Sequence, residues 1–318
     1  MSMVCRFLQP NAVQNITALD VPDVIRRHAS EVVERGYAVI PAAVSAEVCR
    51  DTVDQFRAFE RAHAAIFAEN RNAGGHYPRI VNLHRVFLPL IRLFTDNPLL
   101  LSTLDVLFGR KASLYTSLFY ESGSQQPLHR DTPLFATRPE YMYFGVTVYL
   151  EPADDDNGCL EVLQGGHKIP ELDRETLALR RYGSLEKIPP LDNDAWSEYQ
   201  NAVVGIGRSQ GMQTSKIHVN TGDTLIWHPQ MPHGGSAIRD GSRSRLSLVM
   251  HVTPEDVPVY HQDVFFSPSR QVSETPTWTY CEINDRKIAK LGNVVSFGHT
   301  HNYPLSEFSW PKPNAYLE

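Results

Sequence analysis

Apolar side chains recur every three or four residues through the first third of the chain, which is the spacing of an amphipathic helix. Residues 22–35 carry this pattern, and Gly36 follows as a typical helix stop. Further helices are expected to begin at Ser45 and at Asn97, because both side chains are good helix caps. The pattern predicts a helical preface over residues 1–111.

From residue 112 onward the pattern changes to alternating apolar and polar positions and to short apolar runs, both typical of strands. Turn residues such as Asp-Asn-Gly at 156–158 separate the runs. Many short strands after a helical segment predict a mainly β fold, a barrel or sandwich braced by flanking helices. The strands are expected over residues 113–120, 143–150, 159–163, 217–219, 224–227 and 246–252.

The chain length of 318 residues fits one large domain, and we expect a single domain over 1–318. Its barrel core is expected over 112–265. Residues 170–211 break the strand rhythm with charge and proline, which predicts a long insertion acting as a lid. Residues 266–318 are expected to form a C-terminal extension.

Composition narrows the function classes. The net charge of -6, without a run of Lys or Arg, makes nucleic acid an unlikely partner. No stretch approaches the roughly 18 apolar residues of a membrane helix, and the first residues carry no apolar signal core, so a cytoplasmic location and no membrane partner are expected. The four cysteines lie far apart without a CxxC pair, which is typical of reduced thiols rather than of a metal knot.

One group of residues suggests metal chemistry. His129 and Asp131 alternate along an extended segment, so both side chains point to the same side and Arg130 points away. His233 follows the strand expected over 224–227 and is placed to supply a third ligand. Two imidazoles and one carboxylate with open coordination positions are the ligand set of a non-haem iron(II) oxygenase. Taken alone, His-x-Asp is a weak signal, because most single histidines are packing or surface residues.

An arginine downstream of the second histidine strengthens the metal interpretation. Arg243 and Arg245 open the strand expected over 246–252. A guanidinium group pairs naturally with the distal carboxylate of a dicarboxylate cosubstrate such as 2-oxoglutarate. The alternative for either arginine is a salt bridge at the strand end, and one of the two is expected to make it.

Five ordered segments resemble the phytanoyl-CoA dioxygenase family of iron- and 2-oxoglutarate-dependent oxygenases. The resemblance covers roughly residues 24–254. Gln164 and Gly166 depart from the family's Pro-Gly-Ser-His element. The matching segments are 34–41 (ERGYAVIP), 126–131 (QPLHRD), 157–167 (NGCLEVLQGGH), 222–236 with Gly-Asp and His-Gly-Gly-Ser, and 245–254 ending in Thr-Pro.

The resemblance implies a double-stranded β-helix, a jelly-roll core. His129, Asp131 and His233 would hold Fe(II), and Arg245, at the family's spacing before Thr-Pro, would bind 2-oxoglutarate; Arg243 remains its competitor. Three further side chains are expected beside the cosubstrate: Ser117, Thr147 and, on the same strand face as Arg245, Ser247. Three other histidines are expected to serve structure: His167, His228 and His251.

The family chemistry implies hydroxylation of an aliphatic C–H by O₂, with succinate and CO₂ as coproducts. Family members that halogenate replace the metal-binding carboxylate with a small residue, so Asp131 favours hydroxylation. The acidic charge balance gives little support to a long acyl-CoA, and a small polar or anionic metabolite is expected. Candidate substrate contacts are Tyr77, Arg79, His84, Tyr120 and Thr132, with Tyr260 or His261 from the C-terminal part.

Two other function classes stay open. A barrel without activity would keep the fold as a binding module, but it would not need a carboxylate between two histidines. A zinc hydrolase could use the same three ligands, but it would need a general base near the metal water and no clamp for a dicarboxylate. The sequence does not specify the oligomeric state, the substrate, or the choice between hydroxylation, desaturation and cyclisation.

Overall fold

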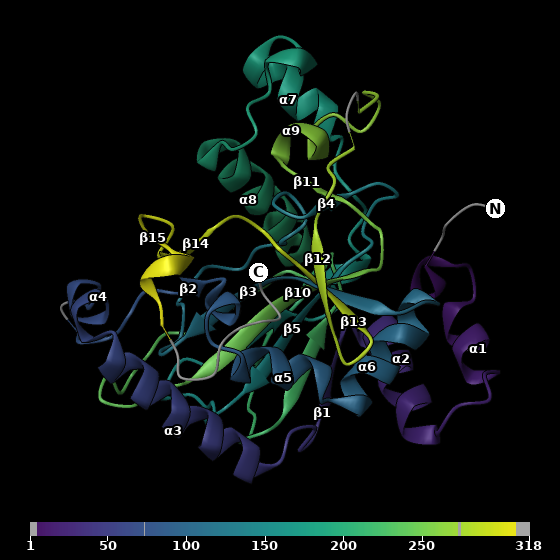
Figure 1. The fold of residues 1–318 in the computed structure, drawn as a ribbon. Coiled ribbons are helices and arrows are strands. Elements are labelled where there is room, and N and C mark those ends of the chain that lie inside the picture. The colour runs from purple at the N-terminus through teal and green to yellow at the C-terminus, as the bar shows by residue number, and fades with distance from the viewer. Residues whose placement is uncertain (1–4, 73, 273–274, 310–318) are drawn as a thin grey trace.

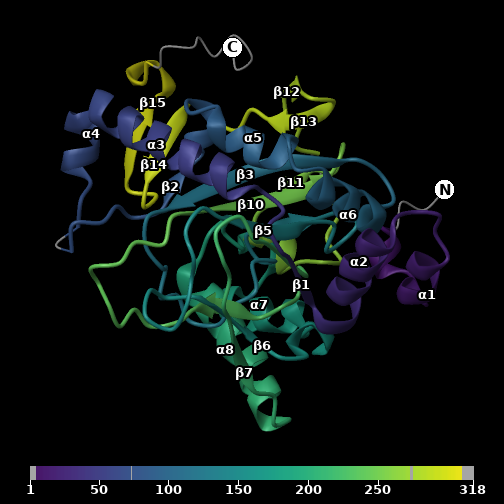
Figure 2. The ribbon, with the colours of Figure 1, turned by 90° about the horizontal axis from the view of Figure 1, so that it is seen from below.

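The computed structural model describes residues 5–72, 74–272 and 275–309. A large sheet runs through the middle of the molecule (Figure 1). Helices α3 and α5 lie on one side of this sheet, and strands β6 and β7 with helix α8 lie on the other (Figure 2).

The N-terminal helices begin and end near the predicted residues. Helix α2 ends at Gly36, whose φ of 83° is the left-handed conformation that glycine adopts without strain. Ser45 and Asn97 cap α3 and α6, because their side chains accept the backbone N–H groups three residues later, at 3.2 Å and 3.1 Å. The helical elements here are η1 (Arg6–Leu8), α1 (Ala12–Thr17), α2 (Asp23–Arg35), α3 (Ala46–Ala62), α4 (Ala64–Glu69), η2 (Leu83–Arg85), α5 (Pro89–Thr95) and α6 (Pro98–Phe108).

The large sheet has the strand order β1-β8-β5-β10-β3-β2-β14-β15, and every pair along this path is antiparallel. Strand β13 pairs with β12 and, in parallel, with β3. The strands are β1 (Tyr37–Ile40), β2 (Ile80–Val81), β3 (Ala112–Tyr120), β5 (Phe144–Tyr149), β8 (Thr224–Trp227), β10 (Ser247–Pro254), β12 (Tyr280–Ile283), β13 (Arg286–Ala289), β14 (Val294–Phe297) and β15 (His301–Pro304).

A smaller antiparallel sheet faces the large one. Apolar side chains of both sheets form one buried cluster, with Tyr149, Leu225 and Trp227 from the large sheet and Val162 and Ile217 from the small one. Two facing antiparallel sheets with flanking helices confirm the predicted jelly-roll core. The remaining strands are β6 (Leu160–Leu163), β7 (Thr214–Ile217) and β9 (His233–Gly235), in the order β7-β6-β9, and the short pair β4 (Ala136–Thr137) and β11 (Val259–Tyr260).

The opposite side of the large sheet packs against the N-terminal helices. Phe56 and Phe59 of α3 belong to the same fully buried cluster as Phe119 of β3 and Leu248 of β10. Rings such as Phe56 and Phe119 lie with centroids 4.5 Å apart. This cluster is the main hydrophobic core, and it leaves the other side of the strands free to carry a site.

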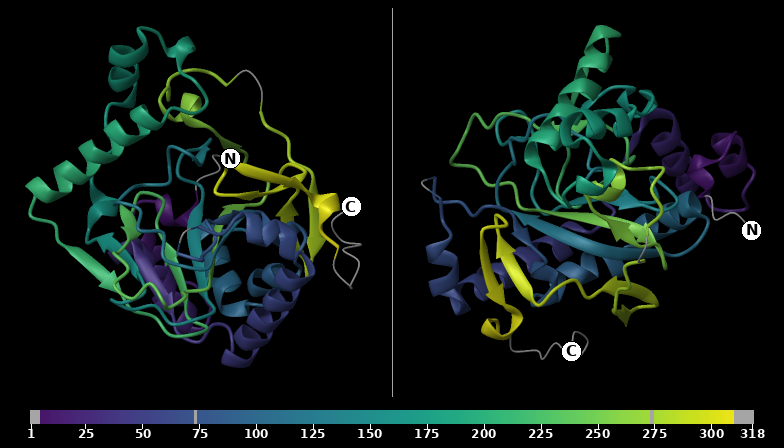
Figure 3. Two further views of the ribbon diagram at one scale, coloured as in Figure 1. Left: turned by 90° about the vertical axis from the view of Figure 1, so that its left-hand side faces the viewer. Right: turned by 90° about the horizontal axis from the view of Figure 1, so that it is seen from above.

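The segment over 170–211 is mostly helical and has a small core of its own. Its elements are η4 (Leu185–Lys187), α7 (Arg174–Tyr182) and α8 (Asn193–Ser209), and η3 (Gly166–Lys168) precedes them. Tyr199 and Val203 of α8 pack with Phe265, from the short helix α9 (Gln262–Phe265). These helices project from the end of the molecule away from α3 (Figure 3).

The C-terminal segment extends the sheet, which the alternation pattern does not predict. Strand β14 pairs with β2, and β13 pairs with β3, so the segment completes one edge of the large sheet before η5 (Leu305–Glu307). The strand predicted over 217–219 lies earlier, as β7. Among the described helices, none combines the length and the apolar character that a bilayer crossing demands.

Candidate functional site

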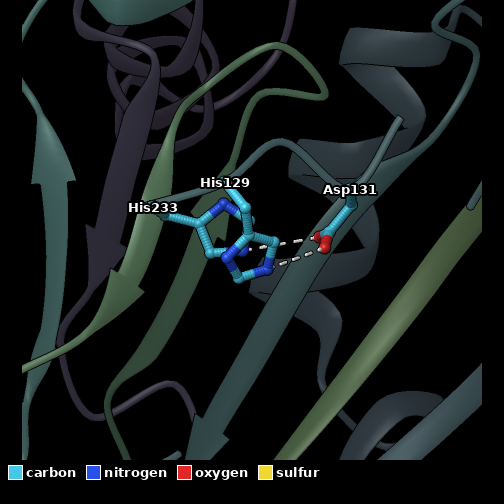
Figure 4. Close-up of side chains that lie close together, drawn as sticks. All are labelled: His129, Asp131 and His233. Atoms are coloured by element: carbon cyan, nitrogen blue, oxygen red, sulfur yellow. Dashed lines mark ion pairs between the residues drawn. The ribbon is translucent and has the colours of Figure 1, made fainter. Parts of the chain in front are cut away.

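The backbone brings His129 and His233 together between the two sheets. The two residues exchange a pair of backbone hydrogen bonds, with N to O distances of 2.8 Å and 2.9 Å, so the segment before Asp131 runs alongside β9. The three side chains His129, Asp131 and His233 converge in Figure 4, where the two rings face the carboxylate.

The three side chains point their ligating atoms into one small space. Each Asp131 oxygen lies 3.5 Å from an imidazole Nε2, Oδ1 from that of His129 and Oδ2 from that of His233. The other ring nitrogen of each histidine, Nδ1, donates to a backbone carbonyl, that of Pro127 at 2.8 Å and that of Met231 at 3.0 Å. These carbonyls fix the tautomer and ring orientation, so both Nε2 lone pairs are available to a metal.

Burial and mutual charge set the ionisation of this group. Burial alone would raise the pKa of Asp131, but the neighbouring imidazoles of His233, His129 and His251 lower it well below its usual range. Burial lowers the pKa of His233 to about 4. Burial opposes the charged form of His129, but the Asp131 carboxylate raises its pKa above the ordinary value. The site therefore offers an ionised carboxylate and a neutral His233.

Two further side chains hold Asp131 in place. The Trp227 indole N–H donates to Asp131 Oδ2 at 3.3 Å, and His251 Nε2 donates to the same oxygen at 3.1 Å. Trp227 fits because Gly145 lies opposite, where a Cβ would approach the indole to 2.0 Å. Sequence reasoning missed Trp227 and gave His251 only a packing role. The signal was alternation, which puts Trp227 and Gly145 on the inner side of paired strands.

Arg130, between the two ligands on the chain, points away as predicted. Its side chain is fully buried, and its nitrogens donate to the carbonyls of Gln230, Gly166 and Ile169. The Gln200 side chain of α8 clamps the Arg130 backbone, because its amide accepts from the N–H and donates to the carbonyl, both at 2.8 Å. The inserted helix thus fixes the strand end that carries the ligands.

A cavity of about 450 Å³ opens in front of the three side chains. Its walls include Trp196 of α8, whose ring lies 5.6 Å from that of His129, and Phe135, which stacks on His251 at 3.7 Å. Asp131 is the one carboxylate among the described residues that line it. The predicted lid segment therefore contributes a wall residue beside the ligand cluster.

Arg245 and Arg243 have different environments. Arg243 makes a surface ion pair with Asp154, with nitrogen to oxygen distances of 2.8 Å and 3.0 Å. Arg245 is buried on the cavity wall, and in the described chain its partner is the carbonyl of Gly158 at 3.0 Å, with no carboxylate. Arg243 is thus the arginine that makes the expected strand-end salt bridge.

Buried polar atoms without partners gather around Arg245. Arg245 Nε, Thr147 Oγ1, Ser247 Oγ and Tyr149 Oη are all buried and accept or donate no hydrogen bond within the described residues. Ser247 pairs with Tyr149 across β10 and β5, and the Arg245 guanidinium lies 5.8 Å from the Tyr149 ring. Because a buried unpaired polar group costs about 1–3 kcal/mol, the cluster is suited to a polar ligand. Tyr149 is absent from the sequence predictions.

The structure separates the predicted contacts into two groups. Arg79, Tyr120, Thr147, Arg245 and His261 line the cavity. Ser117 and His84, which were expected at the cosubstrate and the substrate, lie on the other side of β3, where His84 Nδ1 and the Ser117 hydroxyl are 2.7 Å apart. Ser117 is one position away in strand alternation from Thr116 and Leu118, which line the cavity, and His84 lies in η2, before β3.

Three other predicted substrate contacts also lie outside the cavity wall. The Tyr77 hydroxyl bonds to Glu60, and its ring packs edge-on against Phe67 with centroids 5.1 Å apart. The Thr132 hydroxyl donates to the carbonyl of Pro229 at 2.8 Å. Tyr260 packs with the small core of the insertion. All three side chains are satisfied by structural contacts.

His167 and His228 have the structural environments that were expected. They lie 5.5 Å apart, ring to ring, and burial lowers their pKa values to about 4 and about 3. Both are therefore neutral packing residues. A second group with metal-ligand atoms close together, formed by Asp155, Cys159 and His218, lies at the surface, where Lys216 pairs with Asp155 at 2.7 Å.

A jelly roll with two buried histidines and one carboxylate facing a cavity defines the class of the non-haem iron oxygenases. The sequence profile of the family named Phytanoyl-CoA dioxygenase (PhyH) matches residues 32–246, more than half of the chain. The chain belongs to this family, as the ordered motifs predicted.

Curated relatives and solved structures agree with this assignment. Peroxisomal phytanoyl-CoA dioxygenase of Rattus norvegicus is 28% identical over 127 residues, which are 39% of this chain and 32% of the relative. A probable phytanoyl-CoA dioxygenase of Caenorhabditis elegans is 26% identical over 172 residues, 53% of this chain and 47% of the relative. The aligned regions thus span between a third and a half of these relatives.

Two solved structures share the fold. The epimerase SnoN from nogalamycin biosynthesis, in complex with Fe3+ and alpha ketoglutarate, has a TM-score of 0.57 at 15% identity, covering 85% of this chain and 99% of its own. EctD from S. alaskensis, with 2-oxoglutarate and 5-hydroxyectoine, has a TM-score of 0.53 at 14% identity, covering 80% and 83%. At these identities the likeness shows a common fold.

Proposed function

We propose that the chain is an Fe(II)- and 2-oxoglutarate-dependent dioxygenase that hydroxylates an aliphatic C–H of a small molecule, with succinate and CO₂ as coproducts. The proposal rests on the side chains that face one cavity. A buried His129, Asp131 and His233 cluster and a buried arginine without a carboxylate partner, Arg245, face the same space.

The three proposed metal ligands fit iron(II). Two imidazole nitrogens and one ionised carboxylate are its ligand set in this class of enzyme, and three protein ligands leave positions for a cosubstrate and O₂. The Nδ1 hydrogen bonds of both histidines and the support of Asp131 by Trp227 and His251 are the outer contacts that such ligands need.

The polar cluster around Arg245 fits 2-oxoglutarate. The Arg245 guanidinium would bind the carboxylate far from the metal, and the unpaired hydroxyl groups of Thr147, Tyr149 and Ser247 are available as further donors. A dicarboxylate held this way satisfies buried polar atoms that have no partner within the described protein. The structures of SnoN with alpha ketoglutarate and of EctD with 2-oxoglutarate support the same cosubstrate.

When bound, iron and 2-oxoglutarate supply the oxidising power for O₂-dependent attack on a C–H bond. The protein's part is to bind and orient. Trp227 and His251 fix the Asp131 carboxylate, and Gln200 fixes the backbone next to it. Phe135, Leu134 and Trp196 give the cavity an apolar wall that limits water at the reacting atoms.

The choice of hydroxylation rests on Asp131, because a metal-binding carboxylate occupies the position that halogenating relatives leave open. The cavity also bears on the hydrolase alternative. A hydrolase needs a second acid or base beside the metal water, and the described lining residues offer histidines such as His261 but no carboxylate besides the proposed ligand Asp131. The clamp formed by Arg245 has no use in a hydrolase or in an inactive barrel.

The proposal is tested by turnover without added substrate, because enzymes of this class slowly convert 2-oxoglutarate to succinate on their own. Purified protein with Fe(II), 2-oxoglutarate and O₂ is expected to release succinate, and omission of Fe(II) or the change Asp131→Ala is expected to abolish the release. Hydrolysis of ester or phosphoester substrates, with no succinate under any condition, would overturn the proposal in favour of a hydrolase.

A further inference from the structure

Two guanidinium groups line the cavity, those of Arg245 and Arg79. In the described part of the chain neither forms an ion pair with a carboxylate. Nearby arginines do: Arg57 pairs with Glu121 at 2.7 Å and with Glu60 at 2.9 Å, and Arg71 also contacts Glu60. An arginine on a cavity wall without such a partner is available to an anion from outside the protein.

Arg79 is held in place through its backbone. It directly precedes β2, and its carbonyl accepts the N–H of Gly298 at 2.9 Å, which ties it to the loop between β14 and β15. Its side chain is half-buried. The C-terminal segment, which completes the sheet edge, thereby positions Arg79 at the cavity.

The neighbours of Arg79 leave it as the fixed positive charge of this wall. Burial lowers the pKa of His299, and the charge of Arg79 lowers it further, so His299 stays neutral. The antiparallel register of β2 against β3 pairs Ile80 with Phe119, so Arg79 lies opposite Tyr120, and both side chains line the cavity. Burial raises the pKa of the Tyr120 phenol, which keeps it protonated. A neutral phenol O–H beside a guanidinium forms a pair of donors.

No carboxylate on the described cavity wall pairs with Arg79. Asp131 is the one carboxylate among the described lining residues, and the proposed iron would engage it. Under the proposed function 2-oxoglutarate neutralises Arg245 and leaves Arg79 unpaired. A half-buried guanidinium on a cavity wall, without a carboxylate partner in the described chain, is placed to bind an anion that comes with the substrate.

We propose that the substrate is a small acid whose carboxylate is bound by Arg79 and Tyr120, with its apolar body against Leu134, Phe135 and Trp196. This inference rests on the proposed function, because it assigns the other arginine to 2-oxoglutarate. One guanidinium matches the single charge of a carboxylate. A phosphate ester, with nearly two charges, would need a further cation that the wall lacks.

The size of the cavity supports a free acid rather than a coenzyme A thioester. A volume of about 450 Å³ has to hold both 2-oxoglutarate and the reacting substrate. Coenzyme A carries three phosphate groups, and Arg79 is the one cation on the described wall besides Arg245. Although the family is named after a thioester substrate, this chain offers a site for the acid itself.

The test is binding of matched acids and amides to the anaerobic complex of the full chain with Fe(II) and 2-oxoglutarate. The probes are 3-phenylpropanoate and octanoate, each compared with its primary amide, which has the same shape without the charge. Tryptophan fluorescence reports binding, because Trp196 and Trp227 line the cavity. The variants are Arg79→Gln and, as a matched control, Arg92→Gln, which replaces an exposed arginine of α5.

The wild type and Arg92→Gln are expected to bind each acid at least about tenfold more tightly than its amide. In Arg79→Gln the acids are expected to weaken by roughly 10- to 100-fold, the range for a lost charge-assisted pair, while the amides stay unchanged. Affinity for 2-oxoglutarate is expected to stay the same in Arg79→Gln, which separates this site from that of Arg245.

Equal binding of acids and amides, or no binding of any probe at millimolar concentration to an intact 2-oxoglutarate complex, would overturn the small-acid assignment and leave the proposed function standing. A loss of 2-oxoglutarate affinity in Arg79→Gln would show that Arg79 holds the cosubstrate instead. Failure of the wild type to bind 2-oxoglutarate at all would remove the proposed function, and this inference with it.

Discussion

The two sides of strands β3 and β10 differ in how their polar groups are satisfied. On the side of the helices, Phe119 and Leu248 are fully buried in an apolar cluster, and the buried Ser117 hydroxyl has His84 as its partner. On the cavity side, Arg245 Nε and Ser247 Oγ are just as buried but have no partner in the described chain. On the helix side one such atom, His84 Nε2, is also unpaired, whereas on the cavity side several gather around Arg245 beside one cavity, and this gathering marks the ligand site.

Among the variants proposed here, Asp131→Ala is expected to have the largest effect, because it removes the proposed carboxylate ligand from the cavity side. Affinity for Fe(II) is expected to fall by more than about 100-fold, because one of three protein ligands and its negative charge are lost. Asp155→Ala is the control, since Asp155 belongs to the other group of close ligand atoms, at the surface. Metal content after anaerobic loading checks it, and the reverse order of the two variants would contradict the site assignment.

The next effect is expected from Arg245→Gln, with Arg243→Gln as its control two residues away. Affinity for 2-oxoglutarate is expected to fall by roughly 10- to 100-fold in the first variant, because a charge-assisted pair with the distal carboxylate is lost. The control breaks a surface ion pair with Asp154 and is expected to change the affinity little. Calorimetric titration measures both. Similar losses of affinity in the two variants would contradict the assignment of 2-oxoglutarate binding to Arg245 alone.

A pH experiment probes the core side through His228. Burial lowers its pKa in the folded state to about 3, below the unfolded value near 6.5, so between these values the unfolded state binds more protons. Stability contributed by the neutral ring is present above pH 6.5 and is lost as the pH falls. For His228→Asn the drop in unfolding free energy from pH 7 to pH 5 is expected to shrink by about 2 kcal/mol.

Denaturant unfolding at both pH values, without metal, measures the His228→Asn prediction. The unfolding free energy is also expected to be lower at pH 7, because a packed ring is removed. An unchanged difference between pH 7 and pH 5 would show that His228 is not kept neutral by the core.

The smallest effect is expected from Ser117→Ala, which sharpens the contrast between the two sides of β3. The change removes one buried hydrogen bond to His84, so the unfolding free energy is expected to fall by about 1 kcal/mol. Affinity for 2-oxoglutarate is expected to stay unchanged, because the hydroxyl points away from the cavity. A loss of cosubstrate affinity without a loss of stability would return Ser117 to the cosubstrate pocket.

The helices, the barrel strands and the convergence of His129, Asp131 and His233 could be predicted from local patterns. Caps at Ser45 and Asn97 and a stop at Gly36 are encoded within a few residues. The His-x-Asp spacing encodes a shared side of an extended segment. Only the return of a distant strand carrying His233 required knowledge of the fold, and the ordered family motifs supplied it.

The remaining parts depend on contacts that no local pattern contains. The side of β3 that faces the cavity is set by pairing with β10 across a register shift, and the prediction for Ser117 took the wrong side. Gln200 reaches the Arg130 backbone from a helix 70 residues away. The C-terminal strands β12 to β15 have four residues each, and none alternates strictly between buried and exposed positions.

The central claim is that one cavity holds both iron and 2-oxoglutarate. Anaerobic titration of the metal-free protein with Fe(II) and then 2-oxoglutarate tests it most directly, because the chelate of the two has a weak visible charge-transfer band. This band is expected in the wild type and is expected to be lost or weakened in Asp131→Ala. Metal binding without any band when 2-oxoglutarate is added would contradict the account and would favour a hydrolase or an inactive barrel.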